Sequence, residues 1–108
     1  MATEQTVTEH YREVVRIAEL ADERGAVSDH RFIDCEIIGP AVLVPIRDVH
    51  LSDIVLDVPS VDAAFIELAD DAPLVGMIPL FNVDILRCRM RLVGVGGTAA
   101  SLLMMRGV

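Results

Sequence analysis

The sequence predicts a mainly β protein, in which short strands stack as a solenoid after one N-terminal α-helix. The run Phe32-Ile33-Asp34-Cys35-Glu36-Ile37-Ile38-Gly39-Pro40 has a looser counterpart in Leu86-Arg87-Cys88-Arg89-Met90-Arg91-Leu92-Val93-Gly94. In both runs a Cys precedes a charged residue and then Ile or Met, and the run reaches a Gly. A third short β-rich run lies between them at residues 49–57. Short strands that repeat with Gly or Asp breaks suit a coiled parallel sheet.

The composition indicates one domain, residues 1–108, with a core of branched aliphatic side chains. Hydrophobic residues make up 53% of the chain and aromatic residues 4%, and β-branched residues favour strands. The net charge is −8 and all nine basic residues are Arg. Because an acidic chain repels nucleic-acid phosphates and anionic membrane surfaces, we expect neither as a partner. The first residues have neither a basic nor an apolar signal-peptide region, which predicts a cytoplasmic protein.

The N-terminal helix is expected over residues 6–24. Thr6 and Glu9 have the spacing of a capping box. Apolar residues then recur at intervals of three and four, which gives one apolar stripe. Gly25 stands where a left-handed C-terminal cap belongs. An amphipathic helix in this position is expected to cap the open end of the strand stack.

Residues 32–105 are expected to form the solenoid-like body, in about eight short strands. Ile33, Cys35 and Ile37 alternate with acidic residues, which predicts a strand with one buried face. Further strands are expected over residues 41–46, 49–58, 63–68, 75–80, 81–86 and 88–92, with corners or bends at 39–40, 52–53, 82 and 94–98. The absence of helical patterns between them excludes βαβ folds. An antiparallel sandwich or barrel remains an alternative, although Asn-Gly and Asp-Gly hairpin turns are missing.

The chain resembles a short right-handed parallel β-helix of the kind found in small bacterial proteins. The resemblance lies in Phe32-Ile33-Asp34-Cys35-Glu36-Ile37-Ile38-Gly39-Pro40-Ala41-Val42-Leu43, Gly76-Met77-Ile78-Pro79-Leu80-Phe81-Asn82-Val83 and Cys88-Arg89-Met90. It covers residues 32–97. It implies three to four rungs with Cys and Ile in the stacked interior. β-Helix enzymes that act on polysaccharides are several times longer, so the resemblance implies an architecture and no activity.

Cys35 and Cys88 lie within apolar alternations, where free Cys behaves as a small buried hydrophobe. We therefore predict two reduced, structural thiols. The remaining alternatives are a disulfide or a reactive thiol.

Two charged regions are candidate binding sites. Arg87, Arg89 and Arg91 alternate with apolar residues, so they project from one strand face and could bind an anion. The competing interpretation is a charge ladder, in which Asp34 and Glu36 lie beside these arginines if the two Cys runs stack. Seven acids and no Lys or Arg occupy residues 48–71: Asp48, Asp53, Asp57, Asp62, Glu67, Asp70 and Asp71. Their spacing matches no EF-hand loop, which favours solvated turns over a cation site.

No catalytic constellation is recognisable in the sequence, so we expect a non-enzymatic protein without cofactor or metal. His10, His30 and His50 lack ligand spacing, and no Ser has the context of a nucleophile elbow. The leading hypothesis is an interaction or assembly protein that forms a homo-oligomer, with Leu102, Leu103, Met104 and Met105 as a candidate association surface. The alternatives are a small-ligand or anion-binding module and, by fold analogy only, a carbohydrate-active protein that would need an acid pair such as Asp53 with Asp57 or Asp84.

Overall fold

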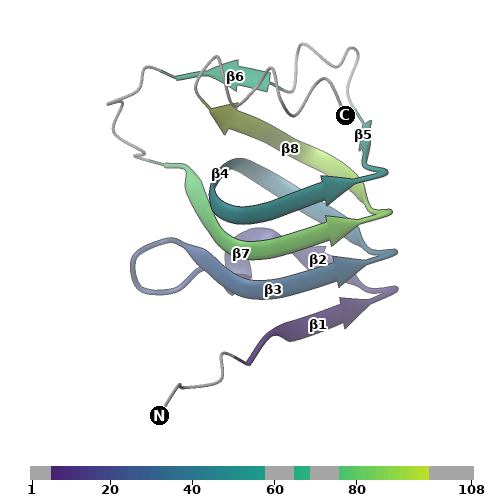
Figure 1. Cartoon of the computed structure of the whole chain (residues 1–108). Helices are drawn as coiled ribbons and strands as arrows, with labels where there is room; N and C mark the ends of the chain where they lie inside the picture. The colour runs from purple at the N-terminus through teal and green to yellow at the C-terminus, as the bar shows by residue number, and fades with distance from the viewer. Residues whose placement is uncertain (1–5, 58–64, 69–75, 98–108) are drawn as a thin grey trace.

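The computed structural model describes residues 6–57, 65–68 and 76–97, and these form one mainly β body (Figure 1). The elements in chain order are β1 Thr8–Tyr11, β2 Val14–Arg16, the 3-10 helix η1 Ile17–Leu20, β3 Val27–Ile33, β4 Glu36–Ser52, β5 Val55–Asp57, β6 Phe65–Glu67, β7 Ile78–Leu86 and β8 Arg89–Gly97. The prediction of a mainly β protein is confirmed. No helix among the described residues is long and apolar enough to cross a membrane.

The strands form one sheet in which every described pair is parallel, and the sheet bends to form four stacked layers (Figure 1). The first layer is β1 and β2. The second layer is β3 and the first part of β4, residues 36–43. The third layer is β7 and β8. The fourth is the second part of β4, residues 43–52, followed by β5 and β6, both of which pair with β8. Register places Tyr11, Ile33, Leu86 and Ser52 in one cross-layer row.

The layers do not follow the order of the chain, as the rungs of a regular solenoid would. β4 leaves the second layer and enters the fourth, and the later pair β7–β8 lies between them. Leu43 marks the crossing point, because it pairs with Ile78 at the start of β7 and with Val95 near the end of β8. The third layer, β7 and β8, therefore comes from a later part of the chain than the two layers on either side of it.

The predicted helix over residues 6–24 is wrong. The segment instead forms β1, β2 and the four-residue η1, and β1 and β2 pair with β3 and β4. The pattern that suggested a helix also permits short strands, and pairing buries Val15 and Ile17 against the core. Tertiary pairing thus overrides the local helical signal. Gly25 does have a left-handed backbone, with φ of 80°, but it closes a turn after η1, where Asp22 accepts hydrogen bonds from the backbone N–H groups of Arg24 and Ala26.

The first corner of each layer uses a residue with positive φ. Arg12, Asp34, Arg87 and Asp53 have φ between 51° and 54° and stack through the four layers. Backbone bonds continue around this corner, from Arg12 N–H to the Ile33 carbonyl, from Asp34 to Leu86 and from Arg87 to Ser52. The break expected near Ser52-Asp53 is confirmed, since β4 ends at Ser52 and β5 begins at Val55.

Three other predicted breaks lie inside strands. Gly39-Pro40 is a bulge within β4 opposite Leu92 of β8, and residues 94–97 belong to β8 rather than to a bend. A Cβ at position 39 would overlap the carbonyl oxygen of Leu92, so this close approach of two layers requires glycine. Asn82 has positive φ within the continuous strand β7, in register with Asp29 and Asp48.

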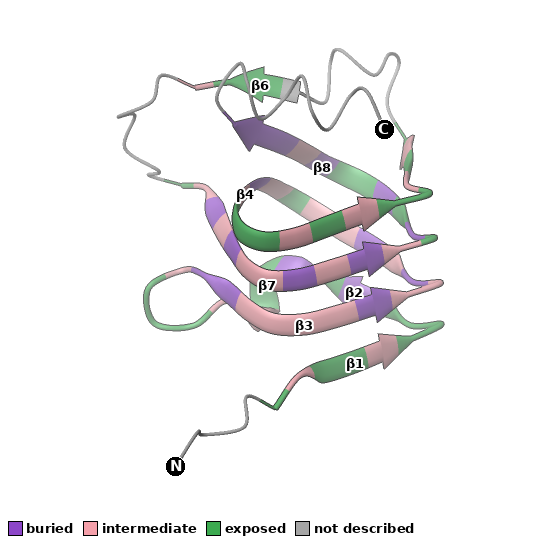
Figure 2. Cartoon of the chain, in the orientation of Figure 1, coloured by how far each residue is buried: buried purple, intermediate pink, exposed green. Residues whose placement is uncertain are grey.

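The core fills the space enclosed by the bent sheet, and its buried positions alternate along β7 and β8 (Figure 2). Its fully buried large side chains include Phe32, Ile37, Leu80, Ile85 and Met90. No buried side-chain nitrogen or oxygen lacks a hydrogen-bond partner among the described residues. The core therefore consists of stacked aliphatic rows, as the composition predicts.

Candidate functional site

The two end layers are the most distinctive surfaces of the described structure. The first-layer edge is β1 and β2, and the fourth-layer edge is residues 47–52 with β5 and β6. No described strand pairs with the outer side of either edge. Large apolar side chains lie exposed on both, namely Tyr11 at 55%, Val14 at 68% and Val55 at 51%. Open parallel edges with exposed apolar side chains are able to accept further strands.

The structure confirms that the two Cys runs stack, since Glu36, Ile37 and Ile38 pair with Arg89, Met90 and Arg91. Arg87 Nε donates to Asp34 Oδ1 at 2.9 Å, as the charge ladder predicts. This hydrogen bond and the carboxylate charge raise the pKa of Arg87 above its ordinary value. Glu36 instead bonds Arg91, with Nε to Oε1 at 2.9 Å.

The stripe of Arg87, Arg89 and Arg91 therefore has two guanidinium groups neutralised by carboxylates of the neighbouring layer. Arg89 is exposed, and no ion pair to another described residue is found for it. A carboxylate that already occupies a guanidinium competes with an incoming anion. Anion binding at this stripe stays a prediction, with Arg89 as its most accessible member.

The acidic residues of the 48–71 region do not converge within the described part of the chain. Asp48, Asp53, Asp57 and Glu67 are described, and they belong to β4, the corner after it, β5 and β6. Asp62, Asp70 and Asp71 lie outside the described residues. No group of three or more His, Cys, Asp or Glu among the described residues is placed to hold a metal ion. Leu102, Leu103, Met104 and Met105 also lie outside the described residues.

The structure brings together two histidines that the sequence spacing separates. His10 Nε2 and His30 Nδ1 are 3.0 Å apart, and both rings stack on Phe32. His10 Nδ1 lies 2.9 Å from Glu13 Oε2. One histidine nitrogen must accept in the His10–His30 bond, so the two rings cannot both be protonated while it persists. The pKa of His30 is lowered, mainly because its ring is partly buried and next because of the charge of His10. The nearby Asp29 has a smaller effect, which raises the pKa.

His50 lies in a different row, where its Nδ1 contacts Asp84 Oδ1 at 2.9 Å. These neighbours follow from the parallel register of β1 with β3, for His10 and His30, and of β4 with β7, for His50 and Asp84. An alternation signal in the sequence could have placed His10 and His30 on strand faces, but the helical interpretation of residues 6–24 concealed it.

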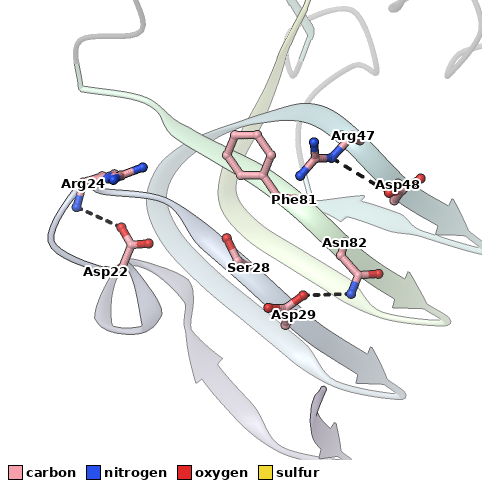
Figure 3. Close-up of a pocket in the computed structure, with 8 residues that line it drawn as sticks. All are labelled: Asp22, Arg24, Ser28, Asp29, Arg47, Asp48, Phe81 and Asn82. Atoms are coloured by element: carbon pink, nitrogen blue, oxygen red, sulfur yellow. Dashed lines mark hydrogen bonds and ion pairs between the residues drawn. The ribbon is translucent and has the colours of Figure 1, made fainter. Parts of the chain in front are cut away.

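A polar pocket of about 430 Å³ lies where the turn after η1 meets the sheet (Figure 3). Its lining combines Arg24 and Arg47 with Asp22, Asp29 and Asp48, and it includes Ser28, Phe81 and Asn82. Asn82 Nδ2 donates to Asp29 Oδ1 at 2.8 Å, and Arg47 lies over the Phe81 ring. Mixed charges beside one aromatic ring could hold a small polar ligand.

Both cysteines are free and buried, as predicted. The backbone N–H of Cys35 lies 3.4 Å from Cys88 Sγ, so the two residues are stacked neighbours. Burial raises the pKa of the Cys88 thiol. A raised pKa reduces the thiolate fraction and hence the nucleophilicity of this sulfur, which favours a structural role.

Comparisons with protein-family models, curated proteins and solved structures find no match for this chain.

Proposed function

We propose that this protein is a non-enzymatic assembly module, a short right-handed parallel β-helix whose copies associate through their end layers. The observation that supports it is the pair of parallel edges whose outer sides pair with no strand of the described residues, each with exposed apolar side chains. A strand edge presents unpaired backbone groups to a partner, and natural proteins usually protect such edges. Residues 6–24, which were expected to cap one end as a helix, instead contain β1 and β2, the first layer of strands.

The experiment is light scattering behind size exclusion over a concentration series of the wild type and a Tyr11→Pro variant. Arg12 N–H points toward β3, so strand alternation directs the Tyr11 N–H toward the open side. Proline removes that outward donor without removing a bond to β3. We expect species larger than the 11.8 kDa monomer for the wild type, and a smaller association constant for Tyr11→Pro.

Tyr11→Ala is the matched control, because it removes the same side chain and keeps the N–H. A wild type that stays monomeric up to high concentration would contradict the proposal.

The polar pocket supports a second candidate function, the binding of a small polar ligand. Arg47 lies over the Phe81 ring, and Arg24 lies at the opposite side of the pocket (Figure 3). Ligand binding to the folded state raises the thermal midpoint by mass action. A thermal-shift screen of small polar and anionic compounds, compared with an Arg47→Ala variant, tests this function.

A further inference from the structure

Charged side chains follow the layers in rows, and in two of these rows acidic and basic residues alternate from one layer to the next. In one row Glu9, Arg31, Asp84 and His50 are in register. Arg31 Nη1 lies 3.5 Å from Glu9 and Arg31 Nε lies 3.3 Å from Asp84, while His50 contacts Asp84 at 2.9 Å. Each charge thus has an opposite or titratable neighbour on the adjacent layer.

The row at the first corner also alternates. Its members are Arg12, Asp34, Arg87 and Asp53, all with positive φ, and the central pair Asp34–Arg87 is an ion pair. Its two outermost members are exposed and of opposite charge, since Arg12 lies on the first-layer edge and Asp53 at the corner of the fourth layer.

Two further rows end in matched residues. Arg16, Ile38, Arg91 and Asp57 form one row, which begins with a cation and ends with an anion. Val14, Glu36, Arg89 and Val55 form the other, which begins and ends with an exposed valine. Four rows therefore present complementary partners at opposite ends of the same molecule.

We propose that a second copy of this chain stacks head to tail, with its first-layer edge on the fourth-layer edge of the first copy. This inference rests on the proposed assembly function and names its partner surface. Glu9 of one copy then faces His50 of the next, Arg12 faces Asp53, Arg16 faces Asp57, and Val14 packs on Val55. In the two alternating rows, acidic and basic residues therefore continue to alternate from one copy to the next.

The backbone pattern supports the same register. At the corner, Arg12 donates to Ile33, Asp34 to Leu86 and Arg87 to Ser52, always toward the next layer. The next member of this series is the Asp53 N–H, and it donates to the Tyr11 carbonyl of the stacked copy. Beyond the corner, Glu36, Arg89 and Val55 donate to the preceding layer, and Val14 of the stacked copy donates in the same way to the Ile54 carbonyl.

A head-to-tail contact uses different surfaces on the two copies, so it produces an open series rather than a closed dimer unless the rotation closes a ring. Each added copy contributes four layers, or about 19 Å of length at about 4.8 Å for each layer. A two-fold contact between two first-layer edges would instead close at the dimer and leave the fourth-layer edge exposed.

The experiment compares the association of Arg12→Asp, of Asp53→Arg and of their equimolar mixture by light scattering. Either substitution alone puts like charges across the interface, and we expect the apparent dissociation constant to rise by about tenfold or more. In the mixture, the introduced aspartate of one variant faces the introduced arginine of the other, so opposite charges meet again and association returns.

Glu23→Arg is the matched control for Asp53→Arg. It makes the same kind of charge change at an exposed position in the turn after η1 and should associate as the wild type does. Circular dichroism and the thermal midpoint of each variant show that its fold is intact. Arginine with positive φ already occurs in this row at Arg12 and Arg87, so the backbone conformation at this corner tolerates Asp53→Arg.

The outcomes separate the two proposals. A monomeric wild type overturns both. Association that neither Arg12→Asp nor Asp53→Arg weakens overturns head-to-tail stacking and leaves the assembly function standing. A dimer weakened by Arg12→Asp but unaffected by Asp53→Arg identifies first-layer pairing and also overturns the head-to-tail arrangement. Weakening by both, with recovery in the mixture, supports it.

Discussion

The first layer and the two middle layers use the same elements, two strands joined at a corner with positive φ, yet they differ in how much they bury. Residues 27–38 and 78–91 contribute most of the fully buried side chains, including Phe32, Ile37 and Ile85. The first layer contributes Val15 and Ile17, whereas Tyr11 and Val14 are exposed. A layer with neighbours on both sides becomes core, and the same unit at the end becomes a surface. The predictions below test this difference.

The largest effect is expected from Gly39→Ala in the second layer. The new methyl group meets the backbone of Leu92 in the third layer, and backbone cannot move aside as a flexible side chain can. We expect loss of the native circular dichroism spectrum.

Gly25→Ala is the comparison near the first layer. It has left-handed φ but nothing within 4 Å of the added atom, so it should cost about 1 to 2 kcal/mol. A folded Gly39→Ala variant as stable as Gly25→Ala would show that the middle layers can separate.

The next largest effect on stability is expected when a buried core side chain is truncated. Phe32 is fully buried and Tyr11 is 55% exposed. We expect Phe32→Ala to lower the free energy of unfolding by about 3 to 5 kcal/mol, and Tyr11→Ala by about 0.5 kcal/mol or less. Urea titration at low protein concentration measures both. Equal losses would contradict the distinction between core and end layers.

A smaller effect is a loss of stability in acid through His30, which joins the second layer to the first. Its pKa is lowered in the folded state, so the unfolded chain binds more protons below the ordinary value of 6.5. Its contribution is complete above pH 6.5 and is lost as the pH falls toward the folded pKa.

We expect His30→Gln to flatten the dependence of the unfolding free energy on pH between 7 and 5. Wild-type unfolding at several pH values provides the reference. An unchanged slope in the variant would assign the acid sensitivity to other groups.

The smallest effect concerns an ion pair between the second and third layers. Arg91 and Glu36 are partly exposed, and such pairs contribute about 0.2 to 1 kcal/mol. Arg91→Ala should reduce stability by this amount, and 1 M salt should diminish the difference. Arg89→Ala, which breaks no ion pair found among the described residues, is the control. A larger loss for Arg89→Ala would mean that Arg89 carries the contact with Glu36.

Several local features followed from the sequence because they depend on near neighbours. Alternation of apolar and charged residues placed Cys88 and Met90 inside and Arg87 outside. The same alternation placed Leu92 inside, whereas its side chain is 69% exposed. Stacking of the two Cys runs was only a condition of the charge ladder, and the structure shows that they stack. The break at Ser52-Asp53 was visible because Asp tolerates positive φ. The helix over residues 6–24 was wrong because a short amphipathic pattern does not distinguish a helix from two strands that find parallel partners.

The sequence by itself determined a β-rich, aliphatic core with acidic and arginine side chains outside, since those properties arise from side-chain transfer and strand alternation. Only the tertiary structure decided that β7 and β8 lie between the two parts of β4, because parallel pairing joins segments that are distant along the chain. The same pairing brought His10 to His30 and aligned the charged rows from Arg12 to Asp53. Register is a property of the assembled sheet, and so are the surfaces that its end layers present.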